Sequence, residues 1–134
     1  MSSLPFYEHK IRVRYHECDR MGFLHHSVYA VYFEEARTEI LRSRGITYKE
    51  MEDEGIIMPV RSMKFLFKKA AIYDDLLTVR VSILCEPKVR MTFKYEIYNE
   101  NGDFLSDAET ELFFVNKSNM RPIALPEKFL NKMY

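Results

Sequence analysis

The chain has 134 residues, enough for one hydrophobic core, and we treat residues 1–134 as a single domain. Its 20 basic and 20 acidic side chains cancel, so no global field would draw the protein to nucleic acid or to an anionic membrane. Cys18 and Cys85 are the only cysteines and form no CxxC pair, which argues against a disulfide framework.

The amino-terminal segment carries no targeting signal that we can identify. Residues 1–10 have no apolar stretch flanked by basic residues, so they do not resemble a signal peptide. The longest apolar runs of the chain are also too short for a transmembrane helix. The simplest expected compartment is therefore the cytoplasm.

The first predicted element is a half-buried strand over residues 9–15. Ile11, Val13 and Tyr15 fall on one side of the segment and basic residues fall on the other. A period of two residues is that of a strand with one face in the core. A polar loop over residues 16–25 is expected to follow it.

From Ser27 the apolar residues recur at helical spacing as far as Leu41, and Gly45 after a basic last turn is a helix stop. This predicts a helix of four to five turns, at about 3.6 residues per turn. Its first half is apolar over more than a narrow stripe, which favours a helix wrapped by other structure. In such a helix Glu34 or Glu35 would lie near the core, and Glu34 would need a partner.

After the long helix, Thr47 and Glu50 form a capping-box pattern, so residues 48–54 are predicted to be a short second helix. The chain then becomes strand-like, with Asn101–Gly102 as a strong hairpin signal. Residues 116–134 are expected to close with a short helical turn. The four predicted strands are residues 56–68, 76–84, 89–98 and 104–115.

This order of elements predicts an α+β domain. An antiparallel sheet of about five strands, wrapped around one long central helix, buries both apolar patterns. Pro59 indicates an edge or a bulge in the first of the four later strands. The outer face and edges of such a sheet would stay open, so we expect association through an edge strand or a sheet face.

The residues with the most chemical potential lie at the strand-to-helix transition, residues 15–29. A loop in this position directs the free backbone N–H groups of a helix start at whatever lies in front of it. Gly22 supplies a close backbone approach or a positive φ, and Asp19 would stand at the mouth. A carboxylate facing helix-start amides is suited to attack, or to activate water against, a carbonyl. An aspartate in a loop is also a common turn or cap residue, so the residues alone leave both interpretations open.

Other chemistries fit the segment less well. Five potential metal ligands lie close in sequence, but their spacing matches no compact zinc pattern, and we expect no metal site. The side chain of His26 is expected to be a hydrogen-bonded core histidine at the helix terminus. Cys18 is expected to be a small buried hydrophobe, because nothing around it resembles a cysteine-hydrolase segment. The potential ligands are His16, Cys18, Asp19, His25 and His26.

A family resemblance covers nearly the whole chain. It begins with Arg12, Val13, Cys18, Asp19, Gly22, His26 and Tyr29, and continues through residues 33–39, 59–61, 74–77 and 121–126. In this order and spacing, these residues closely resemble the 4-hydroxybenzoyl-CoA thioesterase family. The resemblance is greatest to its small bacterial acyl-CoA thioesterases of the YbgC type.

The resemblance implies a hot-dog fold and hydrolysis of acyl-CoA thioesters by a homodimer or homotetramer with sites at the dimer interface. Asp19 matches the catalytic aspartate, acting as nucleophile or as general base on water. His26 matches the residue whose backbone N–H polarises the thioester carbonyl. Gly22, Tyr29 and Glu34 match motif positions that support substrate binding. No cofactor is implied, because coenzyme A is part of the substrate.

Coenzyme A carries several phosphate charges, which require cations at the mouth of the groove. The alternative for each candidate is an ordinary solvated cation at a strand end. Phe23 and Leu24 are larger than the residues usual at their positions, so the wall near the acyl group is expected to be bulkier. The candidate cations are Lys68, Lys69, Lys88, Arg90 and Arg121.

Two other functions stay open at this point. One is a non-catalytic module that binds acyl-CoA or acyl carrier protein in the same groove. The other is a different hot-dog enzyme, such as a dehydratase acting on acyl carrier protein. A dehydratase would place a catalytic histidine in a proline- and glycine-rich loop, and no such loop surrounds His26.

Overall fold

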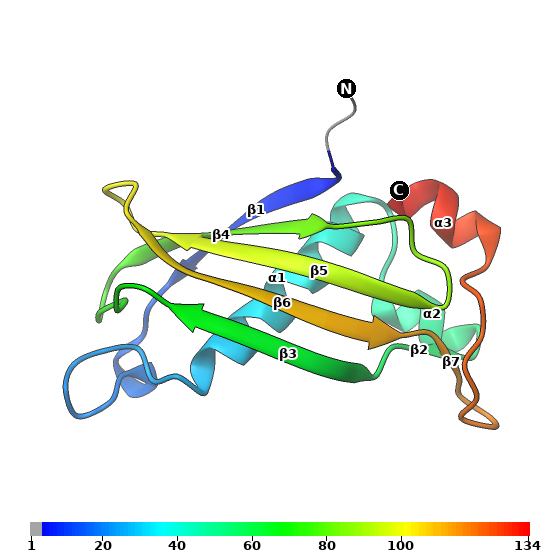
Figure 1. Cartoon of the computed structure of the whole chain (residues 1–134), viewed down its shortest axis with the longest axis horizontal. Coiled ribbons are helices and arrows are strands. Elements are labelled where there is room, and N and C mark those ends of the chain that lie inside the picture. The colour runs from blue at the N-terminus through cyan, green and yellow to red at the C-terminus, as the bar shows by residue number, and fades with distance from the viewer. Residues whose placement is uncertain (1–3) are drawn as a thin grey trace.

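The structure is a computed structural model that describes residues 4–134. Five strands form one antiparallel sheet in the order β1-β4-β5-β6-β3, and helix α1 (Val28–Ser43) crosses one of its faces (Figure 1). This confirms the predicted α+β architecture of a five-stranded antiparallel sheet around one long helix. The strands are β1 (Phe6–Arg12), β3 (Val60–Phe67), β4 (Leu76–Ile83), β5 (Arg90–Tyr98) and β6 (Phe104–Phe113).

The short elements α2, β2, β7 and α3 lie at one end of the sheet, and the 3₁₀ turn η1 lies at the other, between β1 and α1 (Figure 1). Helix α2 begins as predicted, because the side chain of Thr47 accepts a hydrogen bond from the Glu50 N–H at 3.1 Å. Within residues 4–134, no helix is both long and apolar enough to cross a membrane. The smaller elements are the 3₁₀ turn η1 (Tyr15–Glu17), α2 (Tyr48–Asp53), β2 (Ile56–Ile57), β7 (Val115–Asn116) and α3 (Glu127–Met133).

The first strand differs from its prediction. It runs over Phe6–Arg12 rather than residues 9–15, and Ile11 and Val13 are buried as expected. Tyr15 was expected on the same buried side, and this is wrong, because its side chain is 81% exposed. The chain bends into η1 at this residue, so the alternation of a strand no longer applies.

The predicted strand over residues 56–68 is two strands. The break falls at Pro59, between β2 and β3. Proline lacks the N–H that a ladder needs, which explains why the pairing changes there. Strand β2 pairs with β7, and β3 pairs with β6 at the edge of the main sheet.

Helix α1 packs its aromatic side chains against the sheet. The ring of Phe33 lies 4.4 Å from that of Tyr95 on β5 and 5.3 Å from that of Phe65 on β3, between centroids. Closer to the start of the helix, the Tyr29 ring meets that of Phe67 edge to face at 4.9 Å. These ring contacts hold α1 against β5 and the edge strand β3.

The sheet covers only one side of α1. Val31 on the other side is 58% exposed, and Glu34 and Glu35 are also exposed. The expectation that one of these two carboxylates lies near the core is therefore wrong. The charged side chain that the fold buries on this helix is Arg37.

Candidate active site

The loop between η1 and α1 is tied down on both sides. Cys18 and Leu24 face each other in an antiparallel bridge that closes the loop on itself. The N–H of Leu24 donates to the carbonyl of Ala71 at 2.8 Å, and the N–H of His25 donates to the carbonyl of Glu17 at 2.9 Å. The loop is therefore held at a defined position in front of the helix start.

The side chain of Asp19 is held by backbone N–H groups of the same loop. Its Oδ1 accepts the N–H groups of Met21 at 2.9 Å and Phe23 at 3.1 Å. Gly22 stands at φ +84°, which confirms that this position favours glycine. Among residues 4–134, no donor reaches the second carboxylate oxygen, Oδ2. The loop thus orients the carboxylate and leaves one oxygen available.

An open pocket of about 220 Å³ lies in front of Asp19. It brings together five of the predicted site residues: Asp19, His26, Tyr29, Lys68 and Lys69. Its wall also includes the two bulky loop residues expected there. The lining residues are Asp19, Phe23, Leu24, His26, Tyr29, Phe67, Lys68, Lys69 and Ala70.

His26 is one of the residues that line this pocket. Its N–H meets no acceptor in the described part of the chain, whereas the N–H of Val28 already donates to the carbonyl of His25 at 2.9 Å. The imidazole of His26 is exposed and stacks on that of His25, with centroids 4.2 Å apart. The expectation of a core histidine is wrong. The start of α1 carries a partial positive charge, so a negative oxygen near this N–H would be stabilised.

Tyr29 forms an apolar wall of the pocket. Its side chain is 3% exposed and packs on Phe67. Burial raises the pKa of Tyr29, so the phenol stays neutral at physiological pH. Its role in the pocket is therefore to shape the space beside Asp19 rather than to supply charge.

The predicted cations separate into two groups. Lys68 and Lys69 line the Asp19 pocket. The Lys68 ammonium lies 5.8 Å from the centroid of the Phe104 ring, and the Lys69 ammonium pairs with Asp103 at 2.8 Å. Within one protomer, the remaining three lie at the other end of the sheet, beside α2 and β7 (Figure 1). These are Lys88, Arg90 and Arg121. Glu34 also lies outside this pocket and lines a separate cavity.

Sequence reasoning missed Glu17, a buried carboxylate two positions before Asp19. The Tyr32 hydroxyl on α1 donates to its Oε1 at 2.6 Å, and the Arg14 N–H and guanidinium donate to its carboxylate at 2.9 and 3.1 Å. Burial alone would raise the pKa of Glu17, but these hydrogen bonds and the Arg14 charge outweigh it and lower the pKa. Glu17 therefore ties the Asp19 loop to helix α1 through Tyr32. Nothing local in the sequence indicates a partner on the helix.

We expect Glu17→Gln to destabilise the protein by about 2 kcal/mol near neutral pH, because it removes charge-assisted hydrogen bonds. The pKa of Glu17 is lower in the folded protein than its unfolded value of 4.5, so the ionised carboxylate stabilises the fold at pH values above 4.5. This stabilisation is lost as the pH falls through the pKa of the folded state. Urea unfolding of wild type and Glu17→Gln between about pH 7 and about pH 3.5 should show that the difference in their free energies of unfolding decreases on acidification. A difference in free energy of unfolding that does not change with pH would contradict the role of the ionised carboxylate.

Comparisons with known proteins bear on this site. Residues 13–133 match the family profile described as the thioesterase-like superfamily. The chain is 30% identical over 128 residues to the acyl-CoA thioesterase YbgC of Helicobacter pylori, covering 90% of this chain and 94% of that protein. It is 29% identical over 120 residues to the acyl-CoA thioester hydrolase YbgC of Escherichia coli, covering 90% of each. The solved structure of a DHNA-CoA thioesterase from Staphylococcus aureus superposes with a TM-score of 0.88 at 33% identity, over 94% of this chain and 85% of that one.

Proposed function

The chain belongs to the thioesterase-like superfamily, and we propose that it hydrolyses acyl-CoA thioesters to the free acid and coenzyme A within a single hot-dog domain. One observation carries this proposal: Asp19 and His26 line the same pocket, and within residues 4–134 neither Asp19 Oδ2 nor the His26 N–H has a hydrogen-bond partner. A thioester carbonyl placed between them would have a nucleophile or base on one side and an oxyanion donor on the other.

Two routes use the Asp19 carboxylate. As a nucleophile, its oxygen attacks the thioester carbon, the C–S bond breaks with release of the coenzyme A thiolate, and water hydrolyses the resulting anhydride. As a general base, it takes a proton from water, the water oxygen attacks the same carbon, and the proton passes to the departing thiolate. In both routes the carbonyl oxygen becomes negative beside the His26 N–H. Neither route requires a resident cofactor.

A single-turnover reaction in ¹⁸O-labelled water tests the proposal and detects a nucleophilic route in which water attacks the Asp19 side of the anhydride. With enzyme in excess over an acyl-CoA substrate, the general-base route places the label in the released acid. Attack of water on the Asp19 side of an anhydride would instead leave the label in Asp19, which mass spectrometry of the peptide detects. If no acid were formed, hydrolysis by this protein would be contradicted.

We propose that the working unit is a homodimer joined through the β3 edges. The two edges of the sheet differ in exposed side chains. On β1 these are mainly charged, as expected of a protected edge, whereas β3 exposes several large apolar ones. They are Val60, Met63, Leu66 and Phe67. Val31 on helix α1 is a further exposed apolar residue.

Antiparallel pairing of two β3 strands would complete the site. If all eight residues of β3 pair, Val60 of one copy lies opposite Phe67 of the other. The Asp19 pocket of each copy would then face the Val60 end of its partner. That end carries Arg61, whose guanidinium shares Glu111 with Arg90 at 3.1 and 3.9 Å. In this way cations of both copies would surround the phosphates of coenzyme A.

Lys68→Ala is expected to raise KM for acyl-CoA about fivefold with little change in kcat, because one exposed charge pair with a phosphate is lost. The matching N-acetylcysteamine thioester has no phosphates, so its kinetics should not change. Lys94→Ala, on the outer face of β5, is the matched control and should behave as wild type. A fall in kcat with both thioesters would show that Lys68 acts on the fold or the chemistry instead.

A further inference from the structure

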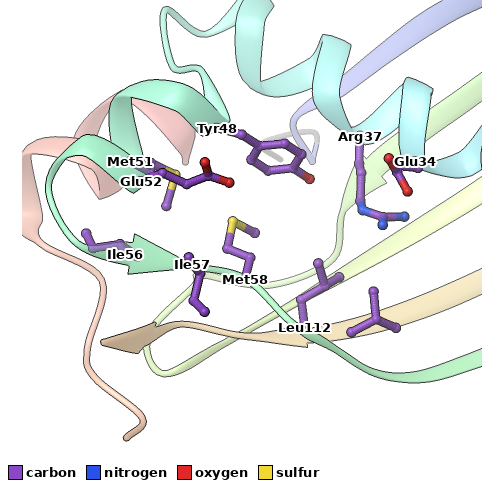
Figure 2. Close-up of a pocket in the computed structure, with 10 residues that line it drawn as sticks. Glu34, Arg37, Tyr48, Met51, Glu52, Ile56, Ile57, Met58 and Leu112 are labelled. Atoms are coloured by element: carbon purple, nitrogen blue, oxygen red, sulfur yellow. The ribbon is translucent and has the colours of Figure 1, made fainter. Parts of the chain in front are cut away.

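A second cavity of about 280 Å³ lies near the Val60 end of the groove between α1 and β3 (Figure 2). We call it the Arg37 cavity. Its wall has both apolar and polar parts, and Met51, Met58 and Leu112 are among the apolar lining side chains. Arg37 and Tyr48 also line it. A cavity of this size is below the usual range for a drug-sized ligand, of about 300–1,000 Å³, and suits part of a larger molecule.

Arg37 is a buried cation that lacks an anionic partner. Its side chain is 6% exposed, and no carboxylate within residues 4–134 lies at ion-pair distance from it. Nη1 donates to the Tyr95 hydroxyl at a long 3.5 Å, and the buried Nε has no acceptor. Since an unsatisfied buried N–H is costly, a ligand acceptor at this position would be stabilising.

Tyr48 presents a second unsatisfied group to the same space. Its hydroxyl oxygen is buried without a hydrogen-bond partner, and Figure 2 shows it turned toward Arg37 and Glu34. Burial raises the pKa of Tyr48 against the opposing effect of the Arg37 cation, so the hydroxyl stays protonated. Two donors, Arg37 Nε and Tyr48 Oη, thus lie close together at one end of the cavity.

The charged residues that line the cavity determine which kind of ligand oxygen it favours. Glu34 and Glu52 also line it, so a carboxylate entering the cavity would meet two negative groups and one positive group. A neutral oxygen avoids this repulsion and can still accept from Arg37 and Tyr48. A hydroxyl would in addition be able to donate to Glu34.

The proposed dimer determines which active site the cavity would serve. Within one protomer the Asp19 pocket and the Arg37 cavity lie at opposite ends of β3, about 23 Å apart at the usual rise of a strand. The rings of Phe33 and Phe65, 5.3 Å apart, occupy the groove between them. Across the dimer, the paired strands lie about 5 Å apart, and the Val60 end of one copy meets the Phe67 end of the other.

We propose that the Arg37 cavity of one protomer receives the distal end of the acyl group hydrolysed at Asp19 of the other. Arg37 and Tyr48 then select acyl groups that carry a neutral oxygen, a hydroxyl or a carbonyl, at that end. This inference rests on the proposed thioesterase function and on the β3 dimer. Its failure is distinguishable from theirs, because hydrolysis of unsubstituted acyl-CoA and the dimer are measured separately.

The first test compares a saturated acyl-CoA series with the matching ω-hydroxy series. At the length that reaches the cavity, we expect kcat/KM to be about tenfold higher for the ω-hydroxy substrate, the value of one hydrogen bond. The matching ω-carboxylate should show no such gain. Tyr48→Phe should reduce the preference toward unity. Tyr98→Phe, which removes a hydroxyl on the outer face of β5, is the control.

Hydrolysis without a preference at any length would overturn the inference, as would a preference that survives Tyr48→Phe. A preference for the ω-carboxylate would overturn the charge argument. Absence of hydrolysis in both series would instead overturn the proposed function, and this inference with it.

The second test asks which protomer supplies the cavity. A heterodimer of Asp19→Asn and Tyr48→Phe subunits, isolated with two affinity tags, pairs the one intact Asp19 with an intact cavity in trans, and should keep the preference. A heterodimer of wild type with the double variant Asp19→Asn, Tyr48→Phe should lose it. The reverse pattern would show that the cavity acts on its own protomer and would overturn the arrangement across the dimer.

Discussion

Replacing Asp19 by asparagine is expected to lower kcat for acyl-CoA hydrolysis by about 10³-fold or more. Asparagine can keep the Oδ1 acceptor that holds the Met21 and Phe23 N–H groups, so the loop should retain its conformation. It loses the negative charge and the basic oxygen that face the pocket. The variant should therefore bind substrate and product nearly as wild type while releasing no thiol.

The fold and the binding of the Asp19→Asn variant are the necessary controls. Thermal unfolding and calorimetric binding of coenzyme A should match wild type, and Asp107→Asn on the outer face of β6 should keep full activity. Full activity in Asp19→Asn would reject this residue as the catalytic group. A loss of binding together with a lower Tm would show a structural role instead.

A carboxylate placed in the edge strand β3 is expected to have the second largest effect on activity. Met63 lies near the middle of β3 with an exposed apolar side chain. In the proposed pairing it lies beside the partner strand, so Met63→Glu would bury a charge at the interface. We expect a folded monomer by light scattering and a fall in kcat/KM of about 100-fold or more, since each site would lose the groups that position its substrate.

The opposite edge of the sheet provides a matched control. Phe6 on β1 is also an exposed apolar residue of an edge strand. Phe6→Glu adds the same charge and should leave both the dimer and the activity unchanged. If Phe6→Glu dissociated the dimer while Met63→Glu did not, the interface would lie on β1, and the completion of the site through β3 would be wrong.

The fold could be predicted because its elements have clear periods and clear ends. Alternation and the glycine stops outline the sheet and α1, and the capping pattern at Thr47 marks α2 correctly. Errors occur where tertiary structure overrides a local pattern. Tyr15 leaves the strand because the chain turns into η1, and Pro59 ends one pairing and permits another.

The candidate site could be predicted only where it is local in sequence. Asp19, Gly22 and His26 belong to one loop, so their arrangement follows from the strand-to-helix transition. Glu17 depends on the Tyr32 hydroxyl of α1, and the Arg37 cavity depends on helices and strands that meet only in the folded chain. A single sequence carries no signal for such contacts. For the same reason, it could not indicate that Lys68 and Arg90 lie at different ends of a protomer.

The most direct test of acyl-CoA hydrolysis at Asp19 is the release of coenzyme A thiol by the purified wild-type protein. Short, long and aromatic acyl-CoA esters would each be incubated with the protein, and free thiol and free acid would be quantified together. We predict saturable, catalytic turnover of at least one class of ester, with equal amounts of thiol and acid. Tight binding of these esters without release of thiol above the buffer rate would contradict hydrolysis and identify the protein as an acyl-CoA-binding module.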